Sequence, residues 1–353
     1  MMRILLLNWR DLKHPSSGGA EVWAHRIAEG LVLRGHDVTF FAAHVDDAPE
    51  DEFINGVRIV RRGSRLTVYR EAKKFYMESP SKFDVILEEI NTRPFFAYKW
   101  GSTPVVHMIH QVAKDVWKYE APFPVSFVGR YFFEPRWLRR LAGQTVLTLS
   151  PSSAESLIEY GISGAIVALP GSDDSQVVYS EKASAPTVVF LGRLVASKRP
   201  DHVVEAFRFV RSQIPNAELW MLGSGQMKQK LEKDLPAGVS LFGHVSHMER
   251  QTRLAQAHVL VATTVREGWG LNVSEASAVG TPTIGYDAPG LRDSIPMSGG
   301  LVVPVSTEKL GMALVEFLNE EISLTPKIAT QSWEEVCVQF ETELSRAVNN
   351  SQS

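Results

Sequence analysis

The sequence is poor in cysteine and has no long hydrophobic run. Among its 353 residues Cys337 is the single cysteine, which excludes an intramolecular disulfide and a cysteine-based zinc cluster. The opening MMRILLLNW has an apolar core far too short for a signal peptide or a membrane span, and no later run is long enough to cross a bilayer. A single cysteine suits a reducing compartment, so we expect a cytoplasmic protein.

Excess charge, metal-binding triplets and dinucleotide fingerprints are also missing. The formal net charge of −3 argues against a general polyanion-binding role, so we expect no nucleic-acid partner. No Asp-x-Asp triplet occurs, and a carboxylate clamp for Mg²⁺ is therefore not evident. The stretch LGSGQMK has Lys228 where GxGxxG requires its third glycine, which disfavours an NAD-type Rossmann oxidoreductase.

The chain does contain enough apolar residues, 44%, for two cores, and its length suggests about two domains. In the first half, strand patterns alternate with helix patterns. The predicted strands span 3–9, 36–44, 84–91, 104–111, 145–150 and 165–170. The predicted helices span 21–33, 68–77 and 152–160, and an NG turn within 53–62 indicates a hairpin. This alternation predicts a doubly wound parallel sheet.

A polar, turn-rich stretch at 171–186 predicts a linker between two domains. A second alternating series follows it. Its strands are predicted at 187–194, 217–222, 239–242, 258–264 and 283–286, and its helices at 202–214, 227–235 and 247–255. We therefore expect an α/β protein with Rossmann-like domains at 1–170 and 187–330 that face a central cleft. The tail, 331–353, is predicted to contain one amphipathic helix.

Two glutamates lie in the stretch EGWGLNVSE, from Glu267 to Glu275. The apolar run before it predicts a buried strand, and we expect a helix over 273–279 with Asn272 as its N-cap. Glu267 would then lie on the loop after the strand and Glu275 in the first helical turn, both at the crevice where parallel sheets bind ligands. The alternative is that Glu275 only completes a cap and Glu267 is a solvated loop charge.

Two cations, Arg193 and Lys198, flank the turn after a strand that ends FLGRL. Pro200 fits the first position of the next helix, so Lys198 lies close to a helix N-terminus, which favours anions. Two positive charges, with about half a charge from the helix, are comparable to the charge of a departing nucleoside diphosphate. We therefore expect a pyrophosphate site that needs no metal. Ordinary surface charges are the alternative.

The first domain offers a glycine pair and polar strand ends. Gly18 and Gly19 allow the backbone to approach a ligand closely and to present amide donors. His110 ends a predicted strand at the cleft edge, where its ring could contact a sugar hydroxyl or a phosphate, although a structural histidine is equally consistent. Asn91 has a similar position, and Glu21 begins the helix after the glycines. His107, earlier in the strand of His110, is expected to be packed.

Four motifs carry a resemblance. The stretch EGWGLNVSEASAVGTP resembles the signature of the large retaining GT-B glycosyltransferase family four (glycosyl transferases group 1). The resemblance extends over most of the chain through GGAE at 18–21, FLGRLVASKRP at 190–200 and LGSGQ at 222–226.

The resemblance implies roles for the candidate residues. Glu275 would bind the donor's ribose, and Glu267 hydroxyls of the transferred sugar. Arg193 and Lys198 would hold the diphosphate, and His110 would contact the donor sugar. The loop of Gly18 and Gly19 would lie against the donor's diphosphate and the acceptor. Donor contacts are also expected from Gly270, Leu271 and Asn272, and weaker acceptor-side contacts from Asn91 and Glu21.

The implied function is metal-independent transfer of a hexosyl unit, with retention, from a nucleotide sugar to a hydroxyl acceptor. We expect no cofactor, and favour a UDP-sugar over GDP-mannose because the family uses UDP-sugars more often. The acceptor would be a glycan, a lipid-linked sugar or a small molecule. A sugar-nucleotide 2-epimerase of the same fold, which needs no acceptor, is the nearest alternative. A non-catalytic binding protein of this fold would be expected to lose the charges of the diphosphate site, and Arg193 and Lys198 are present here.

Aromatic and arginine residues are mixed in the stretch FVGRYFFEPRWLRR at 127–140. This composition fits a segment that touches the inner face of a membrane. It equally fits a helix pair that packs its aromatic side chains inward and leaves its arginines in water. Because Pro135 interrupts a continuous amphipathic helix, we favour the packed arrangement.

Overall fold

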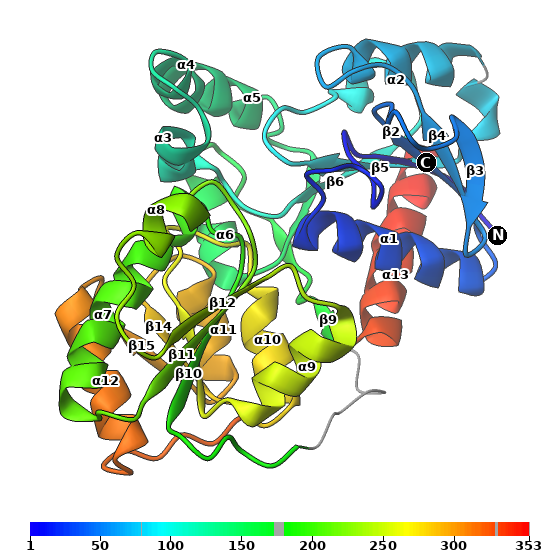
Figure 1. The fold of residues 1–353 in the computed structure, drawn as a ribbon. Helices are drawn as coiled ribbons and strands as arrows, with labels where there is room; N and C mark the ends of the chain where they lie inside the picture. Colours follow the sequence, from blue (N-terminus) through cyan, green and yellow to red (C-terminus); the bar gives the residue numbers. More distant parts are fainter. Residues whose placement is uncertain (79, 173–179, 329–330, 353) are drawn as a thin grey trace.

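Two mainly parallel sheets form the centres of two lobes (Figure 1). The computed structural model describes residues 1–78, 80–172, 180–328 and 331–352. Each sheet alternates with helices along the chain, as the strand and helix patterns predict. The arrangement is a GT-B fold of two Rossmann-like, doubly wound domains, which confirms the predicted fold class.

The first sheet has eight strands in the order β3-β4-β2-β1-β5-β6-β7-β8. All pairs are parallel except β3 with β4, the hairpin predicted from its NG turn, where Asn55 and Gly56 have φ of 48° and 82°. The strands are β1 (Arg3–Leu7), β2 (Asp37–Ala42), β3 (Asp51–Ile54), β4 (Val57–Arg61), β5 (Val85–Ile90), β6 (Val105–Ile109), β7 (Thr145–Thr148) and β8 (Ile166–Val167). Several are shorter than predicted because the flanking apolar residues continue into loops.

The second sheet has six strands, all parallel, in the order β12-β11-β10-β13-β14-β15. These are β10 (Thr187–Leu191), β11 (Glu218–Leu222), β12 (Val239–Gly243), β13 (Val259–Ala262), β14 (Thr283–Tyr286) and β15 (Leu301–Val303). The order reverses at β10 and β13, so a crevice forms beyond the carboxyl ends of these two strands. β15 lies outside the predicted series because it is only three residues long.

Helices cover both sheets. The first domain uses α1 (Gly19–Leu33), α2 (Val68–Glu78) and α6 (Pro151–Ile158). The second uses α7 (Pro200–Gln213), α8 (Lys228–Glu232), α9 (His247–Gln256), α10 (Leu271–Ala278), α11 (Leu291–Met297) and α12 (Thr307–Leu318). The sequence patterns did not predict α11 and α12. No helix in the described part of the chain is both long and apolar enough to span a membrane.

The C-terminal helix α13 (Trp333–Gln352) packs against α1 of the first domain, as the red and blue helices of Figure 1 show. Phe340 is fully buried, with its ring 5.1 Å from that of Trp23. The chain reaches α13 through β16 (Gln331–Ser332), which pairs with β9 (Gly171–Ser172). The predicted linker, 171–186, lies partly outside the described residues.

Residues 117–140 form a projecting segment that we call the aromatic arm. It consists of α3 (Trp117–Glu120), α4 (Val125–Val128), the π-helix η4 (Gly129–Phe133) and α5 (Glu134–Arg139). The expectation that its aromatic side chains pack inward is wrong for Phe127, Tyr131 and Phe132, which are about half exposed. These helices are too short to bury both of their faces, although Leu138 of α5 packs into the core beside β6 and β7.

We predict that Phe340→Ala lowers the free energy of unfolding by about 3–5 kcal/mol, because it leaves a cavity between α13 and α1. Urea denaturation followed by circular dichroism measures this change. Val338→Ala, which truncates a side chain 39% exposed on the same helix, is the matched control and should change stability by less than about 1 kcal/mol. Equal stability of the two variants would contradict the packing of α13 on the first domain.

Candidate functional site

The loops after β10 and β13 run side by side at the carboxyl edge of the second sheet. The Val265 amide donates to the Ser197 carbonyl at 2.9 Å, and the Thr263 hydroxyl donates to the Lys198 carbonyl at 2.8 Å. Neighbouring parallel strands end at one edge, so residues far apart in sequence meet there. These contacts place the short helix η6 (Ala196–Lys198) beside the first residues of the EGWG stretch.

Lys198 and Glu267 form an ion pair across these two loops. Their side chains are 24% and 20% exposed, so the pair is half-buried but open to the solvent on one side. The sequence analysis placed both residues in the cleft, and the structure brings these two together. Opposite charges in a half-buried site attract each other more strongly than in water. Because the site is open to solvent on one side, Lys198 or Glu267 can still exchange its partner for a ligand.

Arg193 follows the same strand but has a different partner. Its Nη2 lies 3.7 Å from Oε1 of Glu120, and the Ser197 hydroxyl donates to the same oxygen at 3.3 Å. Glu120 belongs to α3 of the aromatic arm, so this carboxylate links the first domain to the proposed diphosphate loop. Sequence reasoning missed Glu120, because a single acid in an irregular segment has no distinguishing pattern.

The helix that carries Asn272 and Glu275 begins earlier than predicted. Gly270 is the N-cap of α10, with a φ of 101°, and the helix starts at Leu271. The expectation that Asn272 is the N-cap and that Glu275 lies in the first turn is therefore wrong. The glycine adopts a left-handed conformation that other residues avoid, which allows the chain to enter the helix at once. Asn272 instead donates from Nδ2 to the Leu191 carbonyl at 3.1 Å and ties α10 to β10.

Glu275 lies on the side of α10 that faces α9. Its Oε1 is 3.5 Å from Nη2 of Arg250, and its side chain is 28% exposed. Glu267 pairs with Lys198 instead, so the ion pairs of the two candidate acids involve different partners.

The EGWG stretch also contacts the first domain. A Cβ atom on Gly268 would lie 2.6 Å from the His110 carbonyl oxygen, so only glycine permits this approach. Trp269 is 1% exposed and packs with the core of the first domain, and its indole donates to the Ser274 hydroxyl at 2.8 Å. A Cβ atom on Gly19 would lie 3.1 Å from Leu271 Cδ1. The GGAE and EGWG motifs therefore meet at the interface of the domains.

A second set of interdomain contacts lies between α6 and α11. The Gly290 amide donates to the Ser152 hydroxyl at 2.8 Å, and the Ser152 amide donates to Asp293 Oδ2 at 3.1 Å. In the second domain, the Glu267 amide donates to the Pro289 carbonyl at 3.0 Å. The loop of Glu267 is therefore hydrogen-bonded to the loop of Pro289 and Gly290, and that loop is itself hydrogen-bonded to the first domain.

His110 directly follows β6, at the carboxyl edge of the first sheet, and it is 7% exposed. Its Nε2 lies 3.3 Å from Oε2 of Glu89, which also accepts from Asn8 Nδ2 at 2.9 Å. Asn91 Nδ2 in turn donates to Asn8 Oδ1 at 2.9 Å. The predicted sheet-edge residues His110 and Asn91 thus join one polar network. The ring centroids of His110 and Trp23 lie 5.1 Å apart in an edge-to-face arrangement.

Glu89 is the member of this network that sequence reasoning missed. It is 1% exposed, and burial raises the pKa of its carboxyl group, against the effect of the hydrogen bond from His110. Its Oε1 has no hydrogen-bond partner within the described structure. Buried polar atoms are nearly always paired, so this unpaired oxygen is unusual. Two adjacent acids in the otherwise apolar strand DVILEEIN were the available sequence clue.

The other acid of that strand, Glu88, is structural. Its carboxylate accepts from the backbone amides of Phe95, Phe96 and Ala97 at 2.6–3.0 Å. Burial raises the pKa of Glu88 to about 7 in spite of these three donors. The neighbouring His107 is fully buried, as expected for a packed residue, and burial lowers its pKa to about 3.

Glu21 supports the glycine loop and does not face the cleft. It is fully buried, accepts from the Gly18 amide at 2.7 Å and from Arg10 Nε at 2.9 Å, and so completes the N-terminal cap of α1. These partners enclose the carboxylate, and its expected acceptor-side contact stays a prediction. Gly18 and Gly19 keep their place at the start of α1, opposite Leu271.

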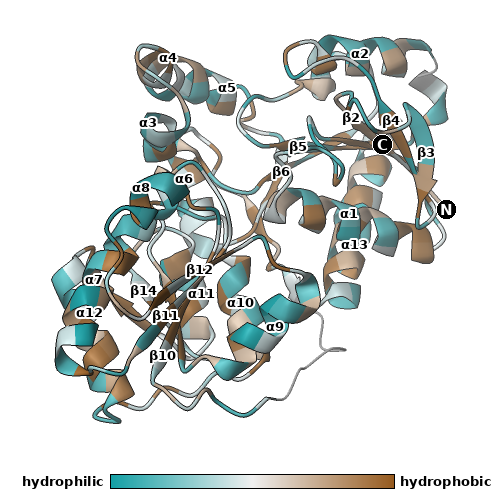
Figure 2. Ribbon diagram, viewed as in Figure 1, coloured by the Kyte–Doolittle hydropathy of each residue, from teal (hydrophilic) through white to brown (hydrophobic). Residues whose placement is uncertain are grey.

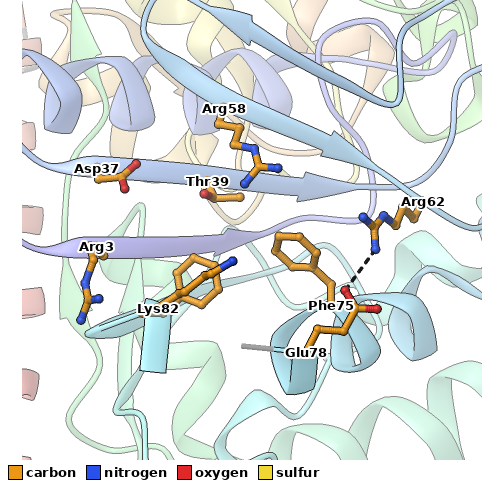
Figure 3. Close-up of a pocket in the computed structure, with 9 residues that line it drawn as sticks. Arg3, Asp37, Thr39, Arg58, Arg62, Phe75, Glu78 and Lys82 are labelled. Carbon is orange, nitrogen blue, oxygen red and sulfur yellow. Dashed lines mark ion pairs between the residues drawn. The ribbon is translucent and has the colours of Figure 1, made fainter. Parts of the chain in front are cut away.

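A separate cavity of about 290 Å³ opens at the amino ends of the first sheet's strands, on the edge opposite to the site (Figure 3). Three of its four lining cations have acidic partners. Arg3 pairs with Asp84 at 2.6 Å, Arg58 with Asp51, and Arg62 with Glu78 at 3.6 Å, the contact drawn as a dashed line. Because most of these charges are already paired, we assign no substrate to this cavity.

Two protein-family models match consecutive parts of the chain. The model described as Glycosyltransferase Family 4 matches residues 17–173, and the model described as Glycosyl transferases group 1 matches residues 172–331. Together they span residues 17–331, which contain all four sequence motifs.

Two curated relatives match parts of the chain. A poly(glycerol-phosphate) alpha-glucosyltransferase of Bacillus subtilis is 32% identical over 152 residues, 41% of this chain and 22% of the relative. A GDP-mannose-dependent monoacylated alpha-(1-6)-phosphatidylinositol monomannoside mannosyltransferase of Corynebacterium glutamicum is 29% identical over 150 residues, 39% of each chain. The matches thus span less than half of these relatives.

Solved structures match nearly the whole chain. Sucrose-phosphate synthase from Thermosynechococcus elongatus aligns with a TM-score of 0.75 at 19% identity and covers 98% of this chain and 99% of its own. An Anabaena protein solved in complex with UDP-glucose aligns with a TM-score of 0.68 at 15% identity, over 99% and 100% of the two chains. At these identities the likeness concerns the fold.

We predict that Gly268→Ala lowers the free energy of unfolding by about 1–3 kcal/mol, because the new methyl group would overlap the His110 carbonyl and push the domains apart. Gly164→Ala is the matched control, since a Cβ atom there meets nothing within 4 Å. Thermal denaturation of both variants measures the difference. A Gly268→Ala protein as stable as the control would show that the domains do not meet at this point.

Proposed function

The chain belongs to the group 1 glycosyl transferases, and we propose that it transfers a hexosyl unit from a nucleoside-diphosphate sugar to an acceptor hydroxyl with retention of configuration. The observation that carries this proposal is the Lys198–Glu267 ion pair, half-buried at the carboxyl edge of the second sheet where it contacts the first domain. A cation for a phosphate and an acid for a sugar hydroxyl stand there side by side.

We assign the donor's diphosphate to Lys198 and Arg193. Each cation is paired with a carboxylate, Glu267 and Glu120, and a diphosphate replaces part of that pairing when it binds. A charge-assisted hydrogen bond to phosphate contributes about 1.5–3 kcal/mol. As the bond to the sugar breaks, negative charge grows on the diphosphate, so these contacts strengthen toward the transition state.

We assign the rest of the donor to residues around this pair. Glu275 accepts hydrogen bonds from the ribose, and Glu267 from hydroxyls of the transferred sugar. Gly270, Leu271 and Asn272 form the donor-side wall at the start of α10, opposite Gly18 and Gly19. On the first domain, His110 contacts the donor sugar, and the buried Glu89 positions the imidazole through its contact with Nε2 at 3.3 Å.

The proposed reaction breaks the bond between the anomeric carbon and the diphosphate oxygen and forms a bond from the acceptor oxygen on the same face. The leaving diphosphate takes the acceptor's proton, so no separate base is required. Same-face attack through an oxocarbenium-like state accounts for retention. Positioning between two domains supplies the required geometry and excludes water.

We further propose that no metal and no cofactor take part. Arg193, Lys198 and the N-terminus of α7 supply about two and a half positive charges, comparable to the charge of the leaving diphosphate. Metal ions serve this purpose in other transferases, and here the cations are already in place. The absence of an Asp-x-Asp triplet from the sequence agrees with this assignment.

For the donor we favour a UDP-sugar, since one structural neighbour was solved with UDP-glucose. GDP-mannose is the second candidate, because one relative's name specifies it. The acceptor is a glycan, a lipid-linked sugar or a small molecule.

A 2-epimerase of this fold is the rival function, and it would convert the nucleotide sugar without any acceptor. A thermal-shift screen of nucleotides and nucleotide sugars identifies the donor and precedes the assays below.

We predict that Lys198→Ala lowers kcat/KM for nucleoside-diphosphate release from this donor by about 100-fold, or roughly 2.7 kcal/mol, because the leaving group loses its counter-charge. The unfolding midpoint should stay close to that of the wild type. Lys309→Ala, an exposed lysine on α12, is the control and should retain full activity. A folded Lys198→Ala enzyme of normal activity would refute the assigned role.

We also predict that the same assay gives an unchanged rate after extensive dialysis against EDTA, with the chelator still present. The physical reason is the positive charge of Arg193, Lys198 and the N-terminus of α7, which takes the place of a metal ion. The control is addition of Mg²⁺ to the dialysed protein, which should raise the rate less than about twofold. Strict dependence on added Mg²⁺ would contradict the charge assignment.

A further inference from the structure

The aromatic arm exposes a dense group of large apolar side chains. Within eleven consecutive residues, six such side chains are between 45% and 81% exposed: Phe123, Val125, Phe127, Tyr131, Phe132 and Phe133. Single exposed apolar residues are normal on protein surfaces, but a contiguous patch usually marks a binding surface. Figure 1 shows α4 at the outer end of the arm, and Figure 2 shows hydrophobic residues (brown) in that helix.

These rings contact one another rather than a core. The ring of Phe127 lies 4.8 Å from that of Tyr131 and 6.2 Å from that of Phe132, and Phe133 stacks on Trp137 at 5.4 Å. The contacts join neighbouring positions of one short segment. The rings of Phe127, Tyr131, Phe132 and Phe133 therefore pack locally within the arm, and each of these side chains is still about half exposed.

The arm is held in place by its base, not by its aromatic tip. The buried carboxylate of Glu134 accepts from the Lys114 amide at 2.9 Å and from Trp117 Nε1 at 3.1 Å. Trp117 packs so tightly on Gly129 that a Cβ atom there would lie 2.4 Å from the indole. These contacts anchor the arm through side chains other than the exposed rings of its tip.

The charge of the arm differs from that of the rest of the chain. Residues 117–140 contain five cationic and two acidic side chains, a formal net charge of +3 in a chain whose total is −3. Of the two acids, Glu134 is buried in the base and Glu120 pairs with Arg193. Three of the cations, Arg136, Arg139 and Arg140, are exposed and follow directly after the aromatic patch.

We propose that the aromatic arm docks on a bilayer that contains anionic phospholipids. The rings of 123–133 would lie among the headgroups and upper acyl chains, where aromatic residues are favoured, and the arginines would contact lipid phosphates. Charge complementarity selects this occupant, since an anionic surface attracts a local charge of +3 although it repels the net charge of the whole chain. The rings and the arginines are both needed, because a few half-exposed rings or a few arginines alone bind membranes weakly.

The base of the arm lies next to the proposed donor site. Glu120 contacts both Arg193 and Ser197 of the diphosphate loop. A docked arm would therefore hold the entrance of the cleft close to the headgroups. In so far as the proposed transfer is correct, this placement favours an acceptor hydroxyl carried by a membrane lipid; the docking itself does not depend on the transfer.

Co-sedimentation of the full chain with vesicles tests the docking. We expect the wild type to pellet with phosphatidylcholine vesicles that contain phosphatidylglycerol, and far less with phosphatidylcholine alone. Phe127→Ser/Phe132→Ser should lower the partition coefficient by about tenfold or more. The matched control is Phe53→Ser/Leu66→Ser, which removes two side chains that are 72% and 78% exposed on the same domain but lie outside the arm, and it should bind like the wild type.

A second pair of variants tests the charge. Arg136→Gln/Arg139→Gln should remove most of the preference for phosphatidylglycerol, whereas Lys73→Gln/Lys74→Gln, two exposed lysines of α2, should leave that preference unchanged. Raised salt should weaken binding of the wild type and of the lysine variant alike.

Three results would overturn the proposal. The wild type could stay in the supernatant with anionic vesicles, or the aromatic variant could pellet as well as its control. Alternatively, size-exclusion chromatography could show a dimer that only the aromatic variant dissociates, which would assign the patch to a second copy of the chain. Thermal shifts with the donor nucleotide, measured on the same samples, separate these outcomes from a failure of the proposed function, since vesicle binding requires no turnover.

Discussion

The site depends on how one short loop, 267–270, is held from two sides. From the second domain, Lys198 pairs with Glu267, and the Pro289 carbonyl accepts its amide. From the first domain, the His110 carbonyl lies against Gly268, and the core encloses Trp269. A glycine is required at the contact because any side chain would separate the two backbones. The Glu267 carboxylate and the polar network of the first domain are therefore fixed relative to each other by the protein itself.

Electrostatic pairing explains how a site with several charges remains stable when it is empty. Each proposed phosphate-binding cation has a carboxylate partner, and these partners lie on different elements, Glu267 on the central loop and Glu120 on the aromatic arm. Binding of a diphosphate would then be an exchange of partners rather than the filling of an unpaired positive pocket. This exchange makes the free energy of diphosphate binding less favourable, but it avoids an unpaired charge in a half-buried site. Through Glu120 it also connects the donor site with the proposed membrane-docking arm.

Sequence patterns predicted the two doubly wound sheets because buried parallel strands are continuous apolar runs separated by helical periods. They also placed Lys198 and Glu267 correctly at one edge, since the carboxyl ends of adjacent parallel strands always meet. The N-cap was misplaced at Asn272, because a left-handed Gly270 can begin a helix and leaves no polar signature. Glu120 and Glu89 could not be assigned, as their partners are distant in sequence. The inward packing expected for the arm failed for its tip because, of its short helices, α5 is the one that reaches a core, through Leu138.

The most direct test of the central claim compares the binding of a nucleoside diphosphate with that of its parent nucleoside by titration calorimetry. If Arg193 and Lys198 hold the diphosphate, the wild type should bind UDP, or the diphosphate of whichever nucleotide the screen selects, roughly 100-fold more tightly than the nucleoside. The Arg193→Ala/Lys198→Ala protein should lose most of that ratio and keep its affinity for the nucleoside. A folded double variant that retains the full ratio would place the diphosphate elsewhere and contradict the account.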